Sequence, residues 1–291
     1  MANLKEVKQR ITSVSSTQQI TKAMKMVAAA KLRKAQDKIL KMRPYSQKLT
    51  AILDDVVSSM GGELEIVYGE QRPVQNVLVV PMTSDKGLCG AFNSNVIKAA
   101  NYLVDNQYKD VNVTILPLGK KAFESFRKRN FKLIADYSEI FMDVNYDSVR
   151  VISEHVMEAF VSKKFDKVIL VYNHFKNVAT QEVVAEQFLP MGGDVVANTE
   201  EKAESDYILE PSKEYVIDEL VPKALKTQFY KAVLESNASE HGARMTSMDK
   251  ATENANDLLK ELKLQYNRTR QAAITNEILE IVAGANALEG T

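Results

Sequence analysis

The chain has 291 residues, and its 45% hydrophobic and 26% charged content is typical of a soluble, folded protein rather than a disordered one. No apolar run approaches the roughly 20 residues that a membrane-spanning helix needs. The single cysteine, Cys89, excludes an internal disulfide and favours a reducing compartment. The first residues, MANLKEVKQRI, lack the apolar core of a secretory signal, so we expect a cytoplasmic protein.

Charge is distributed unevenly although the formal net charge is zero. Residues 1–52 hold twelve Lys or Arg and two acids, a balance of +10, whereas residues 211–291 hold ten bases and twelve acids. The remaining residues, 53–210, therefore carry −8. Within TKAMKMVAAAKLRKAQ (21–36) there is no acid, and the bases are Lys22, Lys25, Lys31, Arg33 and Lys34. Because one sign dominates this short segment, we expect a local acidic partner.

Residues 3–60 are predicted to form one long helix. Asn3 followed by Glu6 is a capping box, and Gly61-Gly62 ends the helical pattern. At ~1.5 Å per residue such a helix is about 87 Å long. Its apolar residues are spaced alternately three and four apart, as in a heptad seam: Leu4, Val7, Ile11, Val14, Ala28, Leu32, Ala35, Ile39, Met42, Leu49, Leu53 and Val56.

The seam is interrupted in its first half. The heptad frame reaches three polar residues there, Gln18, Thr21 and Lys25. We therefore expect the seam to break over this stretch. The apolar residues that would replace them in the seam are Ile20, Met24 and Val27.

The C-terminal segment is also predicted to form a long helix, from Pro211-Ser212 to about Leu288, with the helix-breaking residues Pro222 and Gly242 inside it. Its length is on the order of 115 Å if continuous, too long for a small domain. Two seams recur in it: Met248, Ala251, Ala255, Leu258 and Leu262, then Ile274, Ile278, Ile281, Ala285 and Leu288. Two long seams at opposite ends of the chain predict an antiparallel coiled coil whose longer C-terminal partner protrudes alone.

The middle of the chain has strand periodicity instead. Short β-branched apolar runs occupy 74–82, 111–119, 131–138 and 167–175, and they alternate with helical segments at 93–107, 120–129 and 147–164. This alternation predicts a mostly parallel sheet covered on both faces. Two further segments are candidate edge strands, 183–190 and 206–210.

The predicted fold class is therefore α/β, with a long antiparallel coiled coil of the terminal helices and a central doubly wound, Rossmann-like sheet. The expected division of the chain is 1–62 for the first coiled-coil helix, 63–210 for the α/β domain and 211–291 for the second coiled-coil helix.

One loop lies where nucleotide-binding folds hold phosphate. SDKGLCGAFN (84–93) follows a predicted strand and begins a helix, with Gly87 and Gly90 for close backbone approach and Lys86 for charge. Its spacing matches neither GxGxxG nor GxxxxGKS, so a tight structural turn or a contact surface is favoured over a bound anion. Within the loop, Cys89 is a candidate nucleophile beside a lysine, but no histidine is near in sequence, which favours a buried thiol.

Catalytic chemistry is not indicated elsewhere. The three histidines, His155, His174 and His241, lie on different predicted elements, and none has ligands at metal-binding spacing. We find no Ser/His/Asp pattern. We therefore expect no catalytic residue, no metal and no cofactor.

The basic N-terminal helix has several interpretations. Nucleic-acid binding is disfavoured because residues 1–44 lack aromatic side chains for stacking, and a membrane-surface helix would need a broader apolar face. A solvated coiled-coil face would normally mix both signs of charge. An acidic protein surface around the helix fits better. The tip AAITNEILEIVAGANALEGT (272–291), with three acids and no base, should likewise be enclosed by protein.

Four segments together resemble the gamma-subunit family of F-type ATP synthases. They are TQQITKAMKMVAAAKLRKAQ, SDKGLCGAFN, ASEHGARMTSMDKATENANDLL and LQYNRTRQAAITNEILEIVAGANAL. The resemblance covers both terminal helices and the first loop of the central domain. It implies a rotor shaft, without an active site of its own, that turns inside a ring of catalytic subunits and couples proton flow to ATP synthesis or hydrolysis.

The resemblance also implies contact residues. Lys22, Met24 and Lys25 would face an acidic lever segment of the beta subunits. Four residues of the C-terminal helix match positions that meet the beta subunits: Arg270 and Gln271 at a catch loop, and Thr275 and Glu277 in the same coupled region. Arg244 matches a conserved arginine of the family. The tip residues would turn in a collar at the far end of the ring: Ile278, Ile281, Ala285 and Leu288.

The implied partners are three alpha and three beta subunits, the epsilon subunit and the membrane c-ring, with the delta subunit in the same complex. No nucleic acid is implied and no direct membrane insertion. The resemblance places the chain peripherally at the cytoplasmic face of a bacterial cell membrane. The central segment shows no counterpart of the regulatory insertion of chloroplast and cyanobacterial relatives, so thiol regulation is not expected. The first residues do not resemble an organelle presequence, so we expect a bacterial protein.

Overall fold

The computed structural model describes residues 4–58, 67–135, 137–191 and 213–289. The chain divides into two compact units. One holds the parts of the terminal helices up to Val27 and from Met245 onward, and the other runs from Ala28 to Arg244. Across the described residues, no helix is sufficiently long and apolar to cross a membrane.

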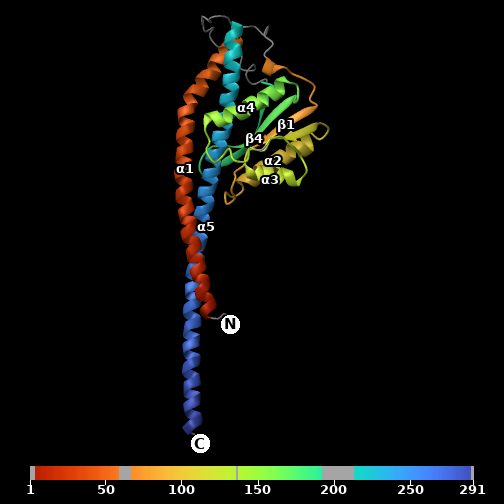
Figure 1. Ribbon diagram of the computed structural model, residues 1–291. Helices are drawn as coiled ribbons and strands as arrows, with labels where there is room; N and C mark the ends of the chain where they lie inside the picture. Colours follow the sequence, from red (N-terminus) through yellow and green to blue (C-terminus); the bar gives the residue numbers. More distant parts are fainter. Residues whose placement is uncertain (1–3, 59–66, 136, 192–212, 290–291) are drawn as a thin grey trace. The chain divides into compact units, whose positions relative to one another are not determined.

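Two long helices, α1 (Leu4–Ser58) and α5 (Lys213–Glu289), account for the terminal segments, as predicted (Figure 1). Pro44 lies inside α1, and Pro222 lies inside α5, without ending either helix. Helix α5 also continues through Gly242. Long helices tolerate such residues where tertiary packing, rather than intrinsic propensity, supplies the stability.

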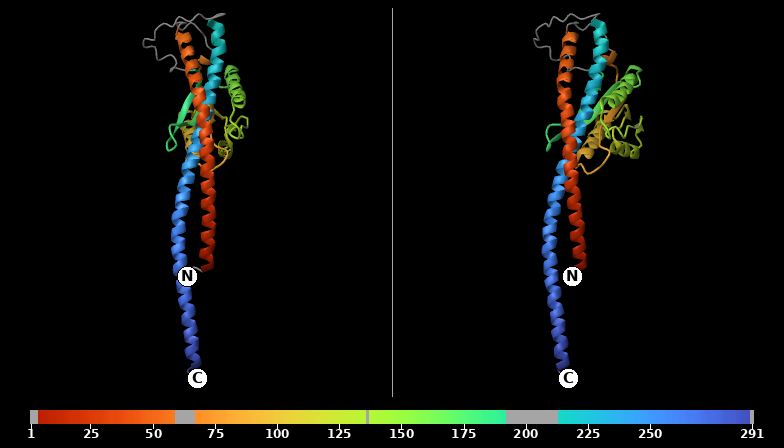
Figure 2. Two further views of the ribbon diagram at one scale, coloured as in Figure 1. Left: turned by 90° about the vertical axis from the view of Figure 1, so that its left-hand side faces the viewer. Right: turned by 60° about the vertical axis from the view of Figure 1, so that its left-hand side comes forward.

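In the first unit, α1 and α5 run antiparallel and side by side in every view (Figures 1 and 2). Three pairs of side chains define their register. Gln18 bonds Asn256, the hydroxyls of Thr21 and Thr252 are 2.9 Å apart, and Lys25 bonds Asp249. From one pair to the next, the α1 residue advances by three and then four while the α5 partner moves back by four and then three, which is the pairing of an antiparallel coiled coil.

The predicted break in the α1 seam is wrong. Thr21 is 8% exposed, whereas Ile20 and Val27 are 59% and 58% exposed. The heptad frame therefore continues through its polar positions, and the apolar residues beside it face outward. Polar side chains stay in the seam because α5 supplies a polar partner at each of these levels.

The α5 seam also differs from the prediction. Leu258 is 39% exposed, whereas its neighbour Leu259 is 9% exposed. The buried residues are Met248, Ala255, Leu259 and Leu262, and the polar Thr252 occupies the heptad position between the first two. Treating only apolar residues as seam positions misplaced the frame, because one true position is a threonine.

The central sheet has five strands in the order β3-β2-β1-β4-β5. The strands are β1 (Asn76–Pro81), β2 (Asn112–Ile115), β3 (Lys132–Leu133), β4 (Lys167–Phe175) and β5 (Gln181–Leu189). All neighbours pair in parallel except β4 with β5, which confirms the mostly parallel sheet. An edge strand was predicted at 183–190 and is found as β5, although its antiparallel direction was not predicted. The candidate strand 206–210 lies outside the described residues.

Strand β3 is shorter than the predicted run 131–138. Ala135 has a φ of 56°, in the left-handed region, which an extended strand cannot accommodate. The pairing resumes only as an isolated bridge between Leu118 and Tyr137.

Helices cover both faces of the sheet, as predicted. Alternate residues of β1 belong to two clusters: Val77 and Val79 to one, Leu78 and Val80 to the other. The first cluster includes residues of α2 (Phe92–Tyr102), the π-helical η2 (Leu103–Gln107) and α3 (Lys120–Lys128). The second includes residues of α4 (Tyr146–Val161), and a short 3-10 turn, η1 (Val67–Gly69), precedes β1.

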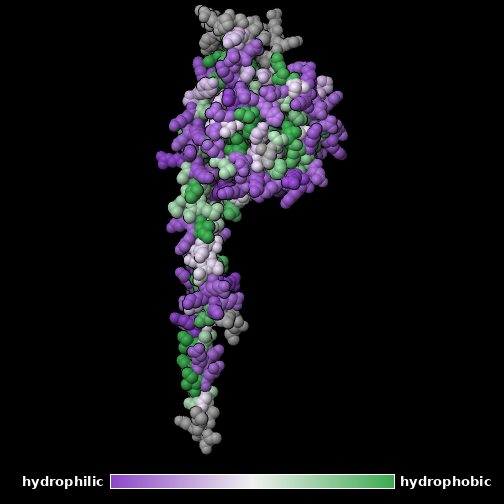
Figure 3. All heavy atoms as spheres, in the orientation of Figure 1, coloured by the Kyte–Doolittle hydropathy of each residue, from purple (hydrophilic) through white to green (hydrophobic). Residues whose placement is uncertain are grey.

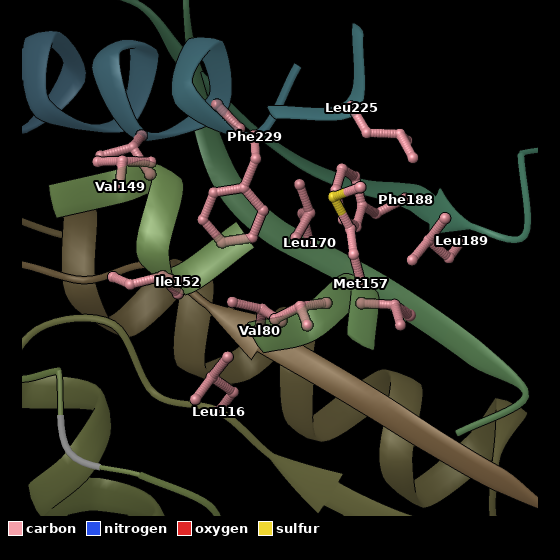
Figure 4. Close-up of a cluster of buried hydrophobic side chains, with 14 of the residues drawn as sticks. Val80, Leu116, Val149, Ile152, Met157, Leu170, Phe188, Leu189, Leu225 and Phe229 are labelled. Atoms are coloured by element: carbon pink, nitrogen blue, oxygen red, sulfur yellow. The ribbon is translucent and has the colours of Figure 1, made fainter. Parts of the chain in front are cut away.

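The second cluster joins α5 to the sheet within the larger unit. Leu225 and Phe229 of α5 are fully buried and point toward Leu170 and Phe188 of β4 and β5 (Figure 4). Phe188 and Phe229 meet edge to face, with their ring centroids 5.4 Å apart. Such buried aromatic contacts hold α5 firmly on this face of the sheet.

Candidate partner-binding surfaces

The first candidate surface is an apolar stripe on α1, formed by Ile20, Met24 and Val27. Their spacing of four and three residues puts them on one helix face. Ile20 and Val27 are well exposed, Met24 is half-buried, and the neighbouring Lys22 is exposed. The α1 stripe therefore presents apolar side chains beside a cation, a combination suited to an acidic protein partner that also offers apolar contact.

Lys25 lies at the edge of this surface, and it also has a partner inside the coiled coil. Its Nζ is 2.5 Å from Oδ1 of Asp249, and the two side chains are 40% and 45% exposed. At this exposure the ion pair contributes little to stability, but it defines where the amine is held.

The second candidate surface is the C-terminal part of α5. Every residue from 274 to 286 is exposed, and we call this segment the α5 tip. It includes Ile274, Ile278, Leu279, Ile281, Val282 and Ala285. Figure 3 shows apolar side chains gathered near this end of the helix. The side chain of Leu288 lies outside the described residues.

The predicted contact residues before and within the tip are exposed too. Arg270, Gln271, Thr275 and Glu277 all lie on the solvent-facing surface of α5. The Thr275 hydroxyl donates to the Gln271 carbonyl, 2.9 Å away, within the helix. Their functional groups are therefore available to a partner, apart from this local bond.

The loop 84–93 follows β1 at the point where the sheet order reverses, the position at which doubly wound folds bind ligands. Here α5 occupies that position. The Ser239 hydroxyl donates to the Asn173 carbonyl at 2.9 Å. The Arg244 guanidinium donates to the carbonyls of Lys86 and Gly87, at 2.9 and 3.3 Å.

These contacts favour the structural interpretation of the loop. A phosphate cradle aims backbone N–H groups at the ligand, whereas this loop aims two carbonyls at a guanidinium. A Cβ added at Gly87 would meet open space, so that glycine is not required for a close approach. Exposed Lys86 and Leu88 form the outer surface of the loop, and Leu88 is held at a φ of 63°.

Arg244 is therefore placed differently from the other predicted contact residues. It belongs to the larger unit, its side chain is 12% exposed, and it pairs with Glu240 one helical turn earlier. Burial raises the pKa of the Glu240 carboxyl, and the neighbouring Arg244 opposes that shift. The guanidinium neutralises a buried carboxylate and holds the loop at the same time.

Cys89 is buried at the base of this loop. Its sulfur lies 3.2 Å from Nδ2 of Asn93 and 3.6 Å from the Ser84 hydroxyl. Burial raises the pKa of the thiol, so that it stays protonated near neutral pH. This environment favours a buried thiol over a nucleophile.

The three histidines lie apart, and two of them make local contacts. His155 meets the Tyr137 hydroxyl at 3.2 Å, and His174 meets Glu235 at 2.5 Å. The Nδ1 atom of His241 is buried without a hydrogen-bond partner. Within the described ranges no three His, Cys, Asp or Glu side chains gather as metal ligands would.

Sequence reasoning missed three residues of α5 that face α1: Asp249, Thr252 and Asn256. The signal was available. If the heptad frame of α1 is continued through its polar positions, it predicts polar partners at the matching positions of α5.

The family model described as ATP synthase matches residues 3–288. The ATP synthase gamma chain of Cytophaga hutchinsonii is 54% identical over 99% of both chains, and that of Christiangramia forsetii is 53% identical over the full length of both. The central stalk and c-ring structure of the Tetrahymena thermophila mitochondrial ATP synthase contains a chain that is 28% identical, with a TM-score of 0.57 over 80% of this chain. A chain from the rotor of the Euglena gracilis enzyme shares the fold at 20% identity, with a TM-score of 0.62 over 93% of this chain.

A long C-terminal helix packed on a five-stranded sheet, with a second long helix at the N-terminus, is a fold that this chain shares with a chain of the Tetrahymena thermophila central stalk. The chain belongs to the ATP synthase family. Within that family it is of the gamma type, the central-stalk rotor of the F-type enzyme, as the sequence resemblance predicted.

Proposed function

We propose that this rotor transmits rotation through two surfaces, the α1 stripe with its neighbouring lysines and the exposed part of α5 from Arg270 onward. Each rotor angle would present a different face to each of three beta subunits and so set the nucleotide affinity of each site. The observation that carries the proposal is the exposure of Ile20, Val27, Ile278 and Ile281. Exposure of such apolar side chains to water is unfavourable, and a partner surface would cover them.

At the α1 stripe, Lys22, Met24 and Lys25 are proposed to face an acidic lever segment of the beta subunits. The balance of +10 over residues 1–52 supports an acidic partner. Apolar contact from Ile20 and Val27 would add affinity without a preferred direction, so the stripe can slide between successive beta subunits.

On α5, Arg270 and Gln271 are proposed to meet a catch loop of a beta subunit, with Thr275 and Glu277 in the same coupled region. Beyond them, Ile278, Ile281, Ala285 and Leu288 are proposed to turn inside a collar at the far end of the ring. Full exposure of the described part of this tip supports an enclosing partner.

Arg244 is proposed to act on the same contacts indirectly. By binding the carbonyls of Lys86 and Gly87 it holds the loop that displays exposed Lys86 and Leu88. A large apolar residue kept exposed in a left-handed conformation is costly for the fold, which supports a binding role for the loop.

The proposed partners are three alpha and three beta subunits, the epsilon subunit and the membrane c-ring, with the delta subunit in the same complex. The chain itself is proposed to have no active site, to bind no nucleic acid and to insert nothing into the bilayer. It would lie peripherally at the cytoplasmic face of a bacterial membrane. The bacterial relatives and the central-stalk structure described above support this placement.

The chain is proposed to divide by function into three segments: the first coiled-coil helix at 1–62, the α/β domain at 63–210 and the second coiled-coil helix at 211–291.

The experiment replaces Ile20 and Val27 together by serine and reconstitutes the variant rotor with its alpha, beta and membrane subunits. ATP-driven proton pumping should fall relative to ATP hydrolysis, because the apolar contact with the beta subunits is weakened. The matched control is Val151→Ser on α4, an apolar residue of similar exposure outside the proposed surfaces. Equal pumping by the double variant and by Val151→Ser would disprove the role of the α1 stripe.

A further inference from the structure

The seam of the first unit is polar over three consecutive levels. Gln18 bonds Asn256, Thr21 lies against Thr252, and Lys25 bonds Asp249. Beyond the Gln18–Asn256 level the seam is apolar, with Val7 buried on α1 and Leu259 and Leu262 buried on α5, and Met248 is buried beside the other end of the polar section. A polar section costs stability compared with an apolar one of the same size, so its presence calls for a reason.

The apolar part of the seam does not by itself select one alignment. Its residues recur every seven positions, so sliding α5 by seven residues would again bring apolar residues together. Such a slip would shift the two helices by about 10 Å along their common axis. Both helices also continue without a break into the larger unit, where Leu53 of α1 and Leu225 of α5 share one cluster. A slip in the first unit therefore requires a local break in one helix, and a feature that specifies the register there adds to that cost.

The polar section disfavours a slip of seven residues in either direction along the helix axis. With α5 moved by seven residues, Lys25 would face the neutral Asn256 or Gly242 instead of a carboxylate. Thr21 would face Leu259 or Met245. Only the observed register gives each polar residue of α1 a polar partner.

The three levels do not contribute equally. Each threonine hydroxyl can also bond a carbonyl of its own helix, Gln18 for Thr21 and Met248 for Thr252. Those bonds would survive a slip. The Lys25–Asp249 pair has no such local substitute, whereas Gln18 would meet Asp249 or Lys263 after a slip. Most of the discrimination therefore comes from Lys25 and Asp249.

We propose that Asp249 is a positioning residue: it selects one register of α1 against α5 through Lys25. The register fixes the level of the α1 stripe relative to Arg270 and the α5 tip. That last consequence rests on the proposed function, whereas the register itself does not.

The first test measures the register in the full-length chain. Spin labels are placed at two exposed positions, Arg10→Cys on α1 and Lys250→Cys on α5, in a Cys89→Ala background, and their separation is measured by pulsed electron paramagnetic resonance. The native polar section should give one distance. A second chain carries an apolar section, with these changes: Gln18→Leu, Thr21→Val, Lys25→Met, Asp249→Ala, Thr252→Val and Asn256→Leu.

The apolar chain should show an added population displaced by about 10 Å. It should also unfold at a higher temperature, because hydrophobic contacts replace polar ones. A single, unchanged distance in the apolar chain would overturn the proposal.

Charge reversal gives a second route if the apolar chain aggregates. Lys25→Asp should broaden the distance distribution, because two carboxylates then face each other, and Lys25→Asp with Asp249→Lys should restore the single distance. The matched control is Lys8→Asp, a reversal at an exposed position of the same helix, which should change nothing. Failure of the double reversal to restore the distance would contradict a positioning role.

Coupling in the reconstituted complex separates this inference from the proposed function. Proton pumping should be lost with Lys25→Asp, and the double reversal should not regain it, because position 25 then still presents a carboxylate to the proposed acidic lever. If the labels follow the predicted pattern while pumping stays unchanged throughout, the register inference holds and the proposed contact at the α1 stripe fails.

Discussion

Two adjacent leucines on α5 have different surroundings although their side chains are identical. Leu259 is 9% exposed in the seam, and Leu258 is 39% exposed beside it. Leu259→Ala should therefore lower the free energy of unfolding by roughly 2–4 kcal/mol, since it removes buried methyl groups and leaves a cavity. Leu258→Ala should change it by less than about 1 kcal/mol. Urea unfolding of the two variants measures this, and equal losses would mean that the frame assigned to α5 is incorrect.

His241 is a residue whose burial makes stability depend on pH. Its pKa is lowered from 6.5 to about 4, first by burial and then by the positive charges of Arg244 and Lys31. The folded state therefore prefers the neutral ring. The free energy of unfolding therefore has its full value above about pH 6.5. It falls by up to about 3 kcal/mol as the pH decreases toward 4, because the unfolded chain then binds a proton at this ring that the folded chain does not.

Denaturant unfolding at several pH values between about 7 and 4 tests this, with His241→Gln as the reference. The variant should lose less stability over this range than the native chain. Glu240 shifts the opposite way, because burial raises its pKa, but it is present in both proteins and cancels in their difference. A constant difference between the two proteins at every pH would contradict the assignment to His241.

At the scale of elements, the sequence predicted most of the fold because the periodicity of each segment is long and regular. The two terminal helices, the parallel strands and the helices between them follow from spacing alone. Strand β3 was overestimated because Ala135 takes a left-handed conformation that nothing in FKLIADYS signals. Boundaries of this kind depend on local backbone geometry rather than on hydrophobicity.

The candidate surfaces were less predictable, for a related reason. Apolar residues on α1 were interpreted as core, so Ile20 and Val27 were assigned to the seam when they face outward. A periodic pattern identifies an apolar face but does not say whether the partner covering it is the same chain or another one. In a rotor that must contact other subunits, both kinds of face occur on a single helix.

Arg244 is the opposite case: a residue expected to contact a partner subunit binds groups of its own chain instead. The resemblance places it among rotor contacts, yet its guanidinium binds the loop after β1 and a buried glutamate of its own helix. Only the packing of α5 on the end of the sheet brings residues 86 and 244 together. Sequence separation of that size leaves no local signal, so the contact emerges from topology.

At the scale of the whole molecule, charge separation matters more than net charge. The chain is formally neutral, so a uniform charge model predicts no salt dependence when it associates with partners. The positive balance of residues 1–52, with exposed residues such as Lys22, Arg33 and Lys34 on α1, predicts otherwise. A cationic helix approaching an acidic surface is steered by long-range attraction, which salt screens over about 10 Å at 0.1 M.

The association rate constant of the rotor with an alpha–beta hexamer should therefore fall by roughly tenfold between low and high salt, measured by stopped-flow fluorescence. Arg33→Glu with Lys34→Glu should slow association at low salt and flatten the salt dependence, because it reverses charge on α1. Lys98→Glu on α2 changes the net charge in the same direction at an exposed site away from that helix. It should leave the rate nearly unchanged. If Lys98→Glu slowed association as much per charge as the α1 variant, net charge rather than the basic helix would govern the encounter.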